Sequence, residues 1–374
     1  MGRIKKLKIQ AGNAYFDFRS QKTRDKILII ESDDWGSIRT KSLGYRDKLN
    51  QISSEIRNDC YTQLDNLADS DDLNALYEVL NSVKDRKGKP ACITVNVCTA
   101  NPDFDRIKKN DFEQFYYEPF TESIKKIHGS QVWSLWQEGI KKGLIKPQLH
   151  GREHLHSLQW MDELRAGNRE LLKAFELESF GIPYRPLLTE RRKNLQAALD
   201  YYGRDGEEHF QKQWLLEGAS LFTEIFGHHS KTFIPPAYIW HSRINKCLKG
   251  AGIEAIQGIK LQYQPKKKSY KRKLRYIGKN KGGLTHLVRN AFFEPVVKPT
   301  KNWVDNTLSG IDHAFKKKQP AIIGSHRLNF IGNLEESNRT KNLNMLSEIL
   351  NKAVKKYPDV QFMSSDDLLK NLVD

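Results

Sequence analysis

Two clusters of polar residues in this chain have the types and spacing of a metal-dependent hydrolase. Asp33 and Asp34 follow an aliphatic run at residues 27–30, which is typical of a buried strand. His150 and His154 lie four residues apart, directly after a second strand-like stretch. One carboxylate with two imidazoles is a common ligand set for a divalent metal that keeps an open coordination position. The second carboxylate is then available as a base.

Short apolar runs alternate with longer helical stretches along the whole chain. The short runs predict strands at residues 27–31, 92–97, 145–150, 232–234, 253–257, 284–289, 321–325 and 360–363. The longer stretches predict helices at residues 71–85, 122–142, 160–175, 207–226, 242–250, 304–317 and 341–356. This alternation predicts a parallel α/β fold, and about seven to eight buried strands favour an irregular (β/α) barrel.

We expect one domain over residues 1–374, with a short N-terminal arm at 1–24 and a basic insertion at 260–281. Catalytic groups of such barrels gather at the C-terminal ends of the strands. Arg289 and His326 also fall at predicted strand ends, as the acidic pair and His150 do. His156 is a third imidazole close to the histidine pair, so the ligand set is ambiguous at this point.

Taken together, these motifs resemble those of the polysaccharide deacetylases of the NodB-homology type, which share five short motifs on an irregular (β/α) barrel. Residues 31–36 (Glu-Ser-Asp-Asp-Trp-Gly) correspond to the first motif, and residues 150–154 keep both ligand positions of the second. Residues 233–238 (Phe-Ile-Pro-Pro-Ala-Tyr) resemble the third, and residues 322–326 end in the histidine of the fifth.

The resemblance implies a role for each of the matching residues. Asp33 is the expected general base and His326 the expected general acid. Asp34, His150 and His154 are the expected ligands of a divalent metal, with Zn²⁺ as the expected ion. The implied activity is removal of acetyl groups from an N- or O-acetylated sugar or polysaccharide, through hydrolysis of a C–N (amide) or ester bond.

The chain departs from the family pattern at several positions. Ile234 stands where the family has an arginine that holds the catalytic carboxylate, and Arg289, Arg39 or Arg327 is the expected substitute. Gly151 replaces a hydroxyl residue of the second motif.

Further departures affect the substrate side of the site. Gly324 replaces a leucine that lines the acetyl pocket, and the fourth motif has no clear copy, with residues 289–295 in its place. Ala237 shifts the tyrosine by one position, so the oxyanion donor is left open among Pro236, Ala237 and Tyr238, with Arg289 as a further substrate contact.

The net charge of +17 is concentrated in the basic segment, which carries ten Lys or Arg residues and no Asp or Glu between Lys260 and Lys281. Such a run is typical of a solvated loop. The alternative is a clamp for a polyanion, either an acidic glycan or a nucleic-acid backbone, with Tyr263, Tyr270 and Tyr276 available for stacking. A catalytically silent barrel that binds a polyanion through this segment is therefore the second functional hypothesis. A third keeps the metal and hydrolyses another kind of C–N bond.

Composition limits the location and the partners of the chain. No apolar run approaches the roughly 18 residues of a membrane span. The basic N-terminus lacks the hydrophobic stretch of a secretory signal, and the four cysteines show no paired spacing. These features predict a cytoplasmic protein with no identifiable protein partner, while the acetylated glycan substrate is what the family resemblance implies.

Overall fold

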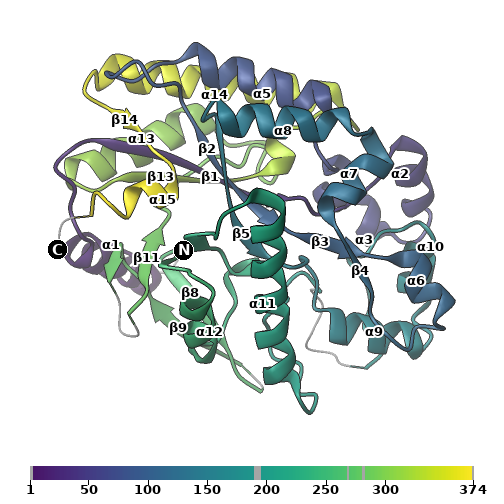
Figure 1. Cartoon of the computed structure of the whole chain (residues 1–374). Helices are drawn as coiled ribbons and strands as arrows, with labels where there is room; N and C mark the ends of the chain where they lie inside the picture. Colours follow the sequence, from purple (N-terminus) through teal and green to yellow (C-terminus); the bar gives the residue numbers. More distant parts are fainter. Residues whose placement is uncertain (1–2, 189–194, 268, 280–282, 373–374) are drawn as a thin grey trace.

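The core of the molecule is a curved, mainly parallel sheet (Figure 1). The computed structural model describes residues 3–188, 195–267, 269–279 and 283–372. The ten-stranded sheet has the order β10-β11-β7-β6-β5-β2-β1-β13-β12, and β14 also pairs with β1. Every pairing is parallel except β10 with β11. Among the described residues the two end strands do not pair with each other, so the sheet forms a half-barrel. The predicted fold class, an irregular (β/α) barrel, is confirmed.

All eight predicted strand positions hold strands of the main sheet. The strands of this sheet are β1 (Ile27–Trp35), β2 (Ile93–Cys98), β5 (Ile145–Gly151), β6 (Thr232–Phe233), β7 (Ala255–Gly258), β10 (Gly278–Lys279), β11 (Thr285–Val288), β12 (Ala291–Phe292), β13 (Ala321–His326) and β14 (Gln361–Phe362). β3 (Ala100–Pro102) pairs with β4 (Tyr117–Pro119), and β8 (Leu261–Pro265) pairs with β9 (Tyr270–Leu274). β1 and β2 are buried along their whole length, as expected for parallel strands that are covered on both faces.

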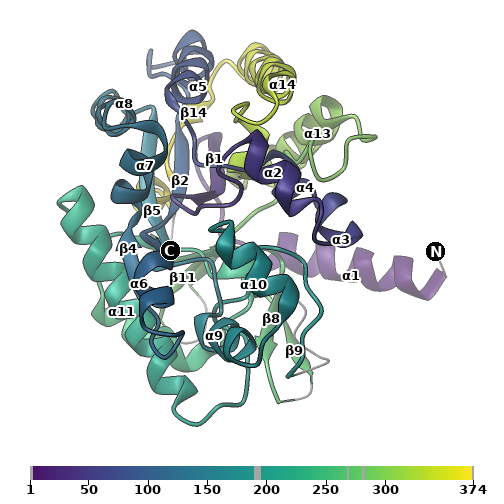
Figure 2. The same ribbon diagram turned by 90° about the vertical axis from the view of Figure 1, so that its right-hand side faces the viewer.

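Helices cover the outside of the sheet and the end at which its strands terminate (Figures 1 and 2). They are α1 (Arg3–Arg19), α2 (Leu43–Leu49), α3 (Ser54–Arg57), α4 (Cys60–Leu64), α5 (Ser70–Ser82), α6 (Phe104–Lys109), α7 (Phe120–His128), α8 (Gln131–Lys141), α9 (Ser157–Arg165), α10 (Arg169–Glu176), α11 (Glu207–Phe226), α12 (Asn245–Gly250), α13 (Trp303–Lys316), α14 (Glu336–Lys356) and α15 (Ser365–Leu368). Three short 3₁₀ turns are η1 (Pro236–Tyr238), η2 (Ser242–Ile244) and η3 (Arg327–Asn329).

Two of the predicted helices are each divided in the structure. The stretch 122–142 forms α7 and α8, which are separated at Gly129 with φ 87°. The stretch 160–175 forms α9 and α10, separated at Gly167 with φ 79°. A glycine in this conformation ends a helix, whereas the apolar periodicity continues into the next helix and hides the break.

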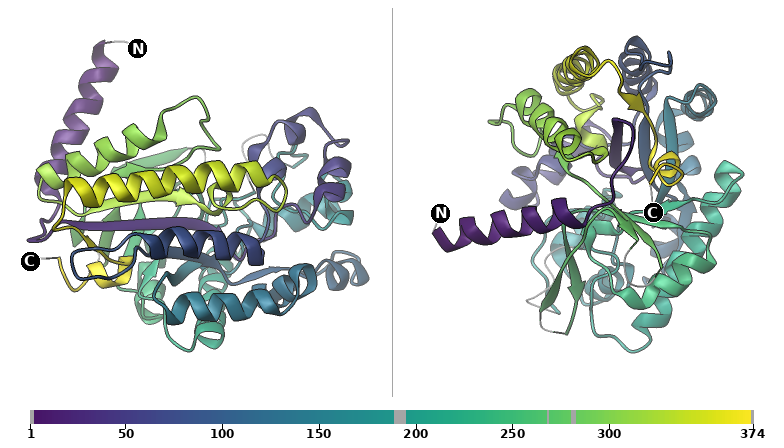
Figure 3. Two further views of the ribbon diagram at one scale, coloured as in Figure 1. Left: turned by 90° about the horizontal axis from the view of Figure 1, so that it is seen from above. Right: turned by 90° about the vertical axis from the view of Figure 1, so that its left-hand side faces the viewer.

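Two segments to which the sequence assigned no helix or strand contain one. Residues 3–19 of the expected N-terminal arm form α1, which projects from the body of the molecule (Figure 3). The basic insertion contains the β8–β9 hairpin, whose strands pair from Leu261–Leu274 to Pro265–Tyr270. None of the helices in the described part of the chain combines the length and apolar composition of a membrane span.

Candidate active site

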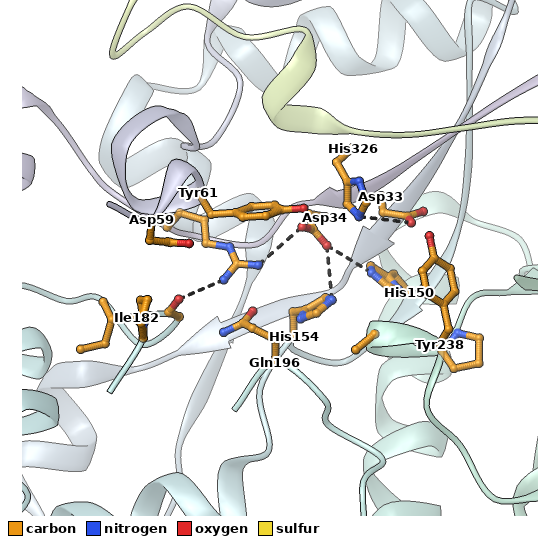
Figure 4. Close-up of a pocket in the computed structure, with 15 residues that line it drawn as sticks. Asp33, Asp34, Asp59, Tyr61, His150, His154, Ile182, Gln196, Tyr238 and His326 are labelled. Atoms are coloured by element: carbon orange, nitrogen blue, oxygen red, sulfur yellow. Dashed lines mark hydrogen bonds and ion pairs between the residues drawn. The ribbon is translucent and has the colours of Figure 1, made fainter. Parts of the chain in front are cut away.

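A cavity of about 340 Å³ opens at the C-terminal ends of the strands, and both predicted motif clusters line it (Figure 4). Its walls come from the ends of β1, β5, β6 and β13 and from the segments that follow them. The lining residues are Asp33, Asp34, Arg39, Asp59, Tyr61, His150, His154, Gly181, Ile182, Pro183, Gln196, Pro235, Ala237, Tyr238 and His326.

A β-bulge at the end of β1 turns two adjacent carboxylates toward the same cavity. In a regular strand, Asp33 and Asp34 would point to opposite faces. The register between β1 and β2 shifts between Ser32 and Trp35, and Asp34 has the left-handed φ of 69°. Such a conformation costs a non-glycine residue roughly 1–3 kcal/mol and is concentrated at functional sites. The strain therefore accompanies an arrangement that regular pleating would not produce.

Two glycines beside the motifs are required by close packing. A Cβ on Gly36 would lie 2.3 Å from the carbonyl oxygen of Cys98. Gly151, with φ 108°, would place a Cβ 2.1 Å from the indole of Trp214. The glycine that replaces the hydroxyl residue of the second motif is therefore explained by the indole from α11, which fills that space.

Asp34, His150 and His154 converge on one point in the cavity. The Nε2 atoms of both histidines lie 3.3 Å from Asp34 Oδ1. The three ligand atoms all lie within 4.8 Å of one another. A separation of 3.3 Å is long for an N–H···O hydrogen bond. It equals the edge, roughly 3.3 Å, of a tetrahedron with the metal–ligand bond lengths of zinc.

The protonation states of these groups suit metal ligands. Burial lowers the pKa of His154 to about 3, so its imidazole is neutral. Burial alone would raise the pKa of Asp34, but His154, His150 and Arg39 hold it well below its usual range. His150 Nδ1 lies 2.8 Å from the carbonyl oxygen of Ile234, and donation to that oxygen leaves Nε2 directed at Asp34. The donor set thus fits a divalent cation.

His156, the third imidazole candidate, lies outside this cluster. Its Nε2 is 3.2 Å from the carbonyl oxygen of Asp200, and its Nδ1 accepts from the backbone N–H of Gln159 at the start of α9. It is therefore a helix-capping residue. The ambiguity in the sequence is resolved in favour of the pair four residues apart.

Arg289 takes the place of the arginine that is missing from the third motif. Its Nη2 and Nη1 donate to the two carboxylate oxygens of Asp33 at 2.6 and 2.7 Å. Asn96 Nδ2 also donates to Asp33 Oδ1 at 2.8 Å. Burial raises the pKa of Asp33, but Arg289 outweighs burial and lowers it, so this carboxylate is ionised and firmly oriented.

The position of Arg289 also explains the loss of the leucine in the fifth motif. A Cβ at Gly324 would lie 2.4 Å from Cδ of Arg289. The arginine side chain runs over this glycine to reach Asp33. The two departures from the family pattern, Ile234 and Gly324, are thus linked by one rearrangement.

The other two candidate arginines contact different carboxylates. Arg39 Nη2 lies 3.5 Å from Asp34 Oδ2, and its Nε lies 3.6 Å from Asp65. Arg327 is fully buried and donates to Asp65 at 2.9 Å. Neither holds Asp33.

His326 lies beside Asp33, on the neighbouring strand of the sheet. The two residues are register partners on the neighbouring strands β13 and β1, and His326 Nε2 is 3.8 Å from Asp33 Oδ2. The other ring nitrogen, Nδ1, is 2.6 Å from Glu294 Oε1. Burial would lower the pKa of His326, but Glu294, together with Asp34 and Asp33, outweighs it and raises the pKa to about 10, so the imidazole is protonated at neutral pH.

The turn after β6 offers one free backbone donor. Ala237 and Tyr238 have φ of 54° and 56°, and Tyr238 N–H donates to the carbonyl oxygen of Pro235 at 2.9 Å. Pro236 has no N–H. The Ala237 N–H has no acceptor among the residues that the structure describes, and Ala237 lines the cavity. Arg289 does not line it, because its side chain is buried behind Asp33.

Sequence reasoning assigned no role to several residues that shape the cavity. Glu294 lies in the stretch 289–295, but nothing in the sequence shows that it reaches His326. Tyr61 from α4 places its ring against His326, with centroids 5.9 Å apart, and its hydroxyl points toward Asp34 (Figure 4). Asp59 and Gln196 come from segments between the motifs, so only the folded chain brings them to the site.

The family model of glycosyl hydrolase family 57 matches residues 41–291, well over half of the chain. The chain belongs to this family. Its members are classed as glycosyl hydrolases. The matched range includes His150, His154 and Arg289, but Asp33, Asp34 and His326 lie outside it. The motif resemblance therefore predicted the fold correctly, but the family that the model shows is a different one.

Comparison with solved structures gives matches of low sequence identity. They include a 4-alpha-glucanotransferase from Thermococcus litoralis (10% identity, TM-score 0.48, covering 92% of this chain and 40% of that one). A GH57-type branching enzyme from Pyrococcus horikoshii has 12% identity and a TM-score of 0.44, covering 94% of this chain and 71% of that one. A proposed polysaccharide deacetylase from Mycobacterium smegmatis has 9% identity and a TM-score of 0.45, covering 95% and 91%. This family 57 chain thus spans less than half the length of the glucanotransferase. A search of curated proteins finds no significant match.

Proposed function

We propose that the chain is a metal-dependent deacetylase that hydrolyses an acetyl ester or acetyl amide on a sugar. The observation that carries the proposal is the convergence of Asp34, His150 and His154 beside the clamped carboxylate of Asp33. A ligand set with its own base and a neighbouring acid is the minimum that such a hydrolysis needs.

Asp34, His150 and His154 would hold a divalent cation, and neutral imidazoles with one carboxylate are a ligand set typical of Zn²⁺. When bound, this ion would polarise the acetyl carbonyl and lower the pKa of water from 15.7 to about 7. Arg39, which contacts the outer oxygen of Asp34, would keep that carboxylate in place.

The remaining groups of the site account for the movement of protons. Asp33, ionised and oriented by Arg289, takes a proton from the water that adds to the acetyl carbon. The Ala237 N–H is available to the developing oxyanion. His326, protonated beside Glu294, then donates a proton to the sugar oxygen or nitrogen as its bond to the acetyl carbon breaks and acetate forms.

Hydrolysis of a glycosidic bond is the second candidate, and the family match favours it. Glycosidases commonly use two carboxyl groups as acid and base or nucleophile. The cavity contains Asp33, Asp34 and Asp59, but two histidines contact Asp34 and an arginine clamps Asp33. A metal-dependent deacetylase gives each of these contacts a role, because the two histidines and Asp34 would be ligands and the arginine holds the base. Hydrolysis of another C–N bond remains the third candidate.

One experiment separates the three reactions. Zn²⁺-supplemented protein is incubated with O-acetylated and N-acetylated oligosaccharides, and acetate and new reducing ends are measured in the same samples. The proposal predicts acetate without reducing ends, with the release abolished by a chelator and by Asp33→Asn. Reducing ends without acetate would favour glycosidic cleavage. Turnover of a cyclic or linear amide, with no acetate from any glycan, would favour the third reaction.

A further inference from the structure

The basic β8–β9 hairpin contacts two of the segments that line the cavity or follow its lining residues. On one side, Gln262 Nε2 donates to the carbonyl oxygen of Trp240 at 2.9 Å, and Tyr263 forms a parallel bridge with Ile239. Both contacts lie within two residues of Tyr238, which lines the cavity. On the other side, the Tyr270 hydroxyl donates to Asp200 Oδ2 at 2.6 Å, four residues after the cavity residue Gln196.

The cations of β9 lack acidic partners. Lys271 and Lys273 of β9, and Arg275 directly after it, alternate in position, so they lie on one face of the hairpin, and Arg272 lies on the other. None of the four forms an ion pair with a carboxylate in the described part of the chain. Arg275 instead donates to the side-chain oxygen of Gln262.

Most of the charged groups near these cations are basic, and the acidic Glu208 there pairs with Arg243 at 3.4 Å. Burial, with Arg275 and Lys271 next, lowers the pKa of Lys273. Burial, Arg243 and Lys273 lower the pKa of His241, which follows Trp240. Several positive charges therefore lie beside the segment 239–241, which follows the cavity residue Tyr238. Lys271, Lys273 and Arg275 have no acidic partner among the described residues and generate a positive surface potential there.

From this placement we propose that the hairpin binds the acidic groups of the substrate, so that the chain acts on an anionic glycan. Carboxylate or phosphate groups on sugars next to the acetylated one would contact Lys271, Lys273 and Arg275, while the acetyl group enters the cavity. Tyr263 and Tyr270, with ring centroids 5.9 Å apart, lie with Arg272 on the other face of the hairpin and are not part of this surface. This inference rests on the proposed function for the cavity but uses none of its catalytic residues.

A charge-reversal pair with a matched control tests the proposal. The test variant is Lys271→Glu with Lys273→Glu. The control is Lys341→Glu with Lys355→Glu on α14, which has the same change in net charge at exposed positions on the opposite side of the molecule (Figure 1). Lys271→Gln with Lys273→Gln removes the cations without adding acids, in case the reversal disturbs folding.

The probes are acetylated oligogalacturonate, acetylated xylo-oligosaccharide of equal length and 4-nitrophenyl acetate. We expect the test variant to lower kcat/KM on the oligogalacturonate by at least 10-fold. On the two neutral probes, kcat/KM of the test variant should differ from that of wild type by less than 2-fold. The control variant should differ from wild type by less than 2-fold on every probe. Raising the ionic strength from 0.05 to 0.5 M should weaken wild-type turnover of the anionic probe and leave the test variant nearly unaffected, because salt screens exposed charges.

Binding of non-acetylated oligogalacturonate, measured by calorimetry, separates failure of this inference from failure of the proposed function. If no probe releases acetate but wild type binds the oligomer and the test variant does not, the hairpin proposal stands and the deacetylase proposal falls. The hairpin proposal would be overturned if the test and control variants lost oligomer binding and kcat/KM on the oligogalacturonate to the same extent. It would also be overturned if wild type showed no preference for the anionic probe. Tighter binding of a 20-base-pair DNA duplex than of the oligomer would overturn it in favour of a nucleic-acid surface.

Discussion

His326 is the residue whose role depends most on its neighbours. Glu294 holds its Nδ1 at 2.6 Å and leaves Nε2 beside Asp33 and the cavity. We expect His326→Ala to lower kcat by roughly 10²–10⁴-fold, the usual effect of removing a general acid or base. Metal content and Tm should hardly change. Loss of metal from this variant would make His326 a ligand instead, and unchanged turnover would place the acid elsewhere.

The pH dependence of activity provides a separate test of Glu294. Its carboxylate is the main group that raises the pKa of His326, which with Asp34 and Asp33 reaches about 10, so the protonated acid persists until the pH approaches that value. In Glu294→Gln the positive charge loses its partner, and the pKa of His326 should fall. The alkaline limb of the kcat profile should therefore move to lower pH, while Glu335→Gln on the surface should leave it in place. An unshifted alkaline limb would show that another group titrates there.

At the scale of elements, the site lies at the ends of β1, β5, β6 and β13, and Arg289 links two of these strands. Arg289 follows β11, passes over Gly324 of β13 and clamps Asp33 of β1. The sequence shows that the usual arginine is absent and offers three substitutes. It cannot select among them, because the choice depends on the order of the strands in space and on the room that a glycine leaves. Strand order is set by pairing between segments far apart in the chain.

Gly324→Ala tests this arrangement. The added Cβ would lie 2.4 Å from Cδ of Arg289, so the arginine must shift away from Asp33. We expect kcat to fall by roughly 10-fold or more, because misplacing a catalytic group by about 1 Å can cost 10²-fold. Gly258→Ala on β7, where a Cβ meets nothing within 4 Å, is the matched control. Equal activities of the two variants would contradict the proposed path of the arginine.

At the scale of the whole molecule, apolar runs predicted all eight strand positions because buried parallel strands have a continuous aliphatic signature. The same patterns did not predict the two helix breaks. They also predicted no strand in the basic segment, because contacts with Trp240 and Asp200, rather than an apolar periodicity, hold its hairpin in place. The motif residues were found because their types are distinctive. Glu294, Asn96 and Tyr61 required the folded chain.

Stability of the whole molecule should depend on pH through His286. This residue of β11 is buried against Trp240, with ring centroids 6.2 Å apart, and burial lowers its pKa to about 3. The unfolded chain takes up a proton near pH 6.5 that folded His286 does not, so its contribution to stability is present above that pH and is lost as the pH falls toward about 3.

The free energy of unfolding from urea titrations at pH 7 and pH 5 measures this effect. His286→Gln should reduce the acid loss of stability relative to wild type by roughly 1 kcal/mol per pH unit. His313→Gln, at an exposed position, should follow wild type. If the two variants have the same pH dependence, His286 is protonated in the folded protein.

Titration of Zn²⁺ into chelator-stripped protein tests the central claim most directly. Wild type should bind one ion per chain, while Asp34→Asn and His150→Ala should bind at least 100-fold more weakly. His156→Asn keeps a side chain that can cap the N-terminus of α9 and lies outside the ligand cluster, so this variant should bind as wild type does. Absence of stoichiometric binding in wild type, or equal binding by all four proteins, would contradict the metal site and the deacetylase built on it.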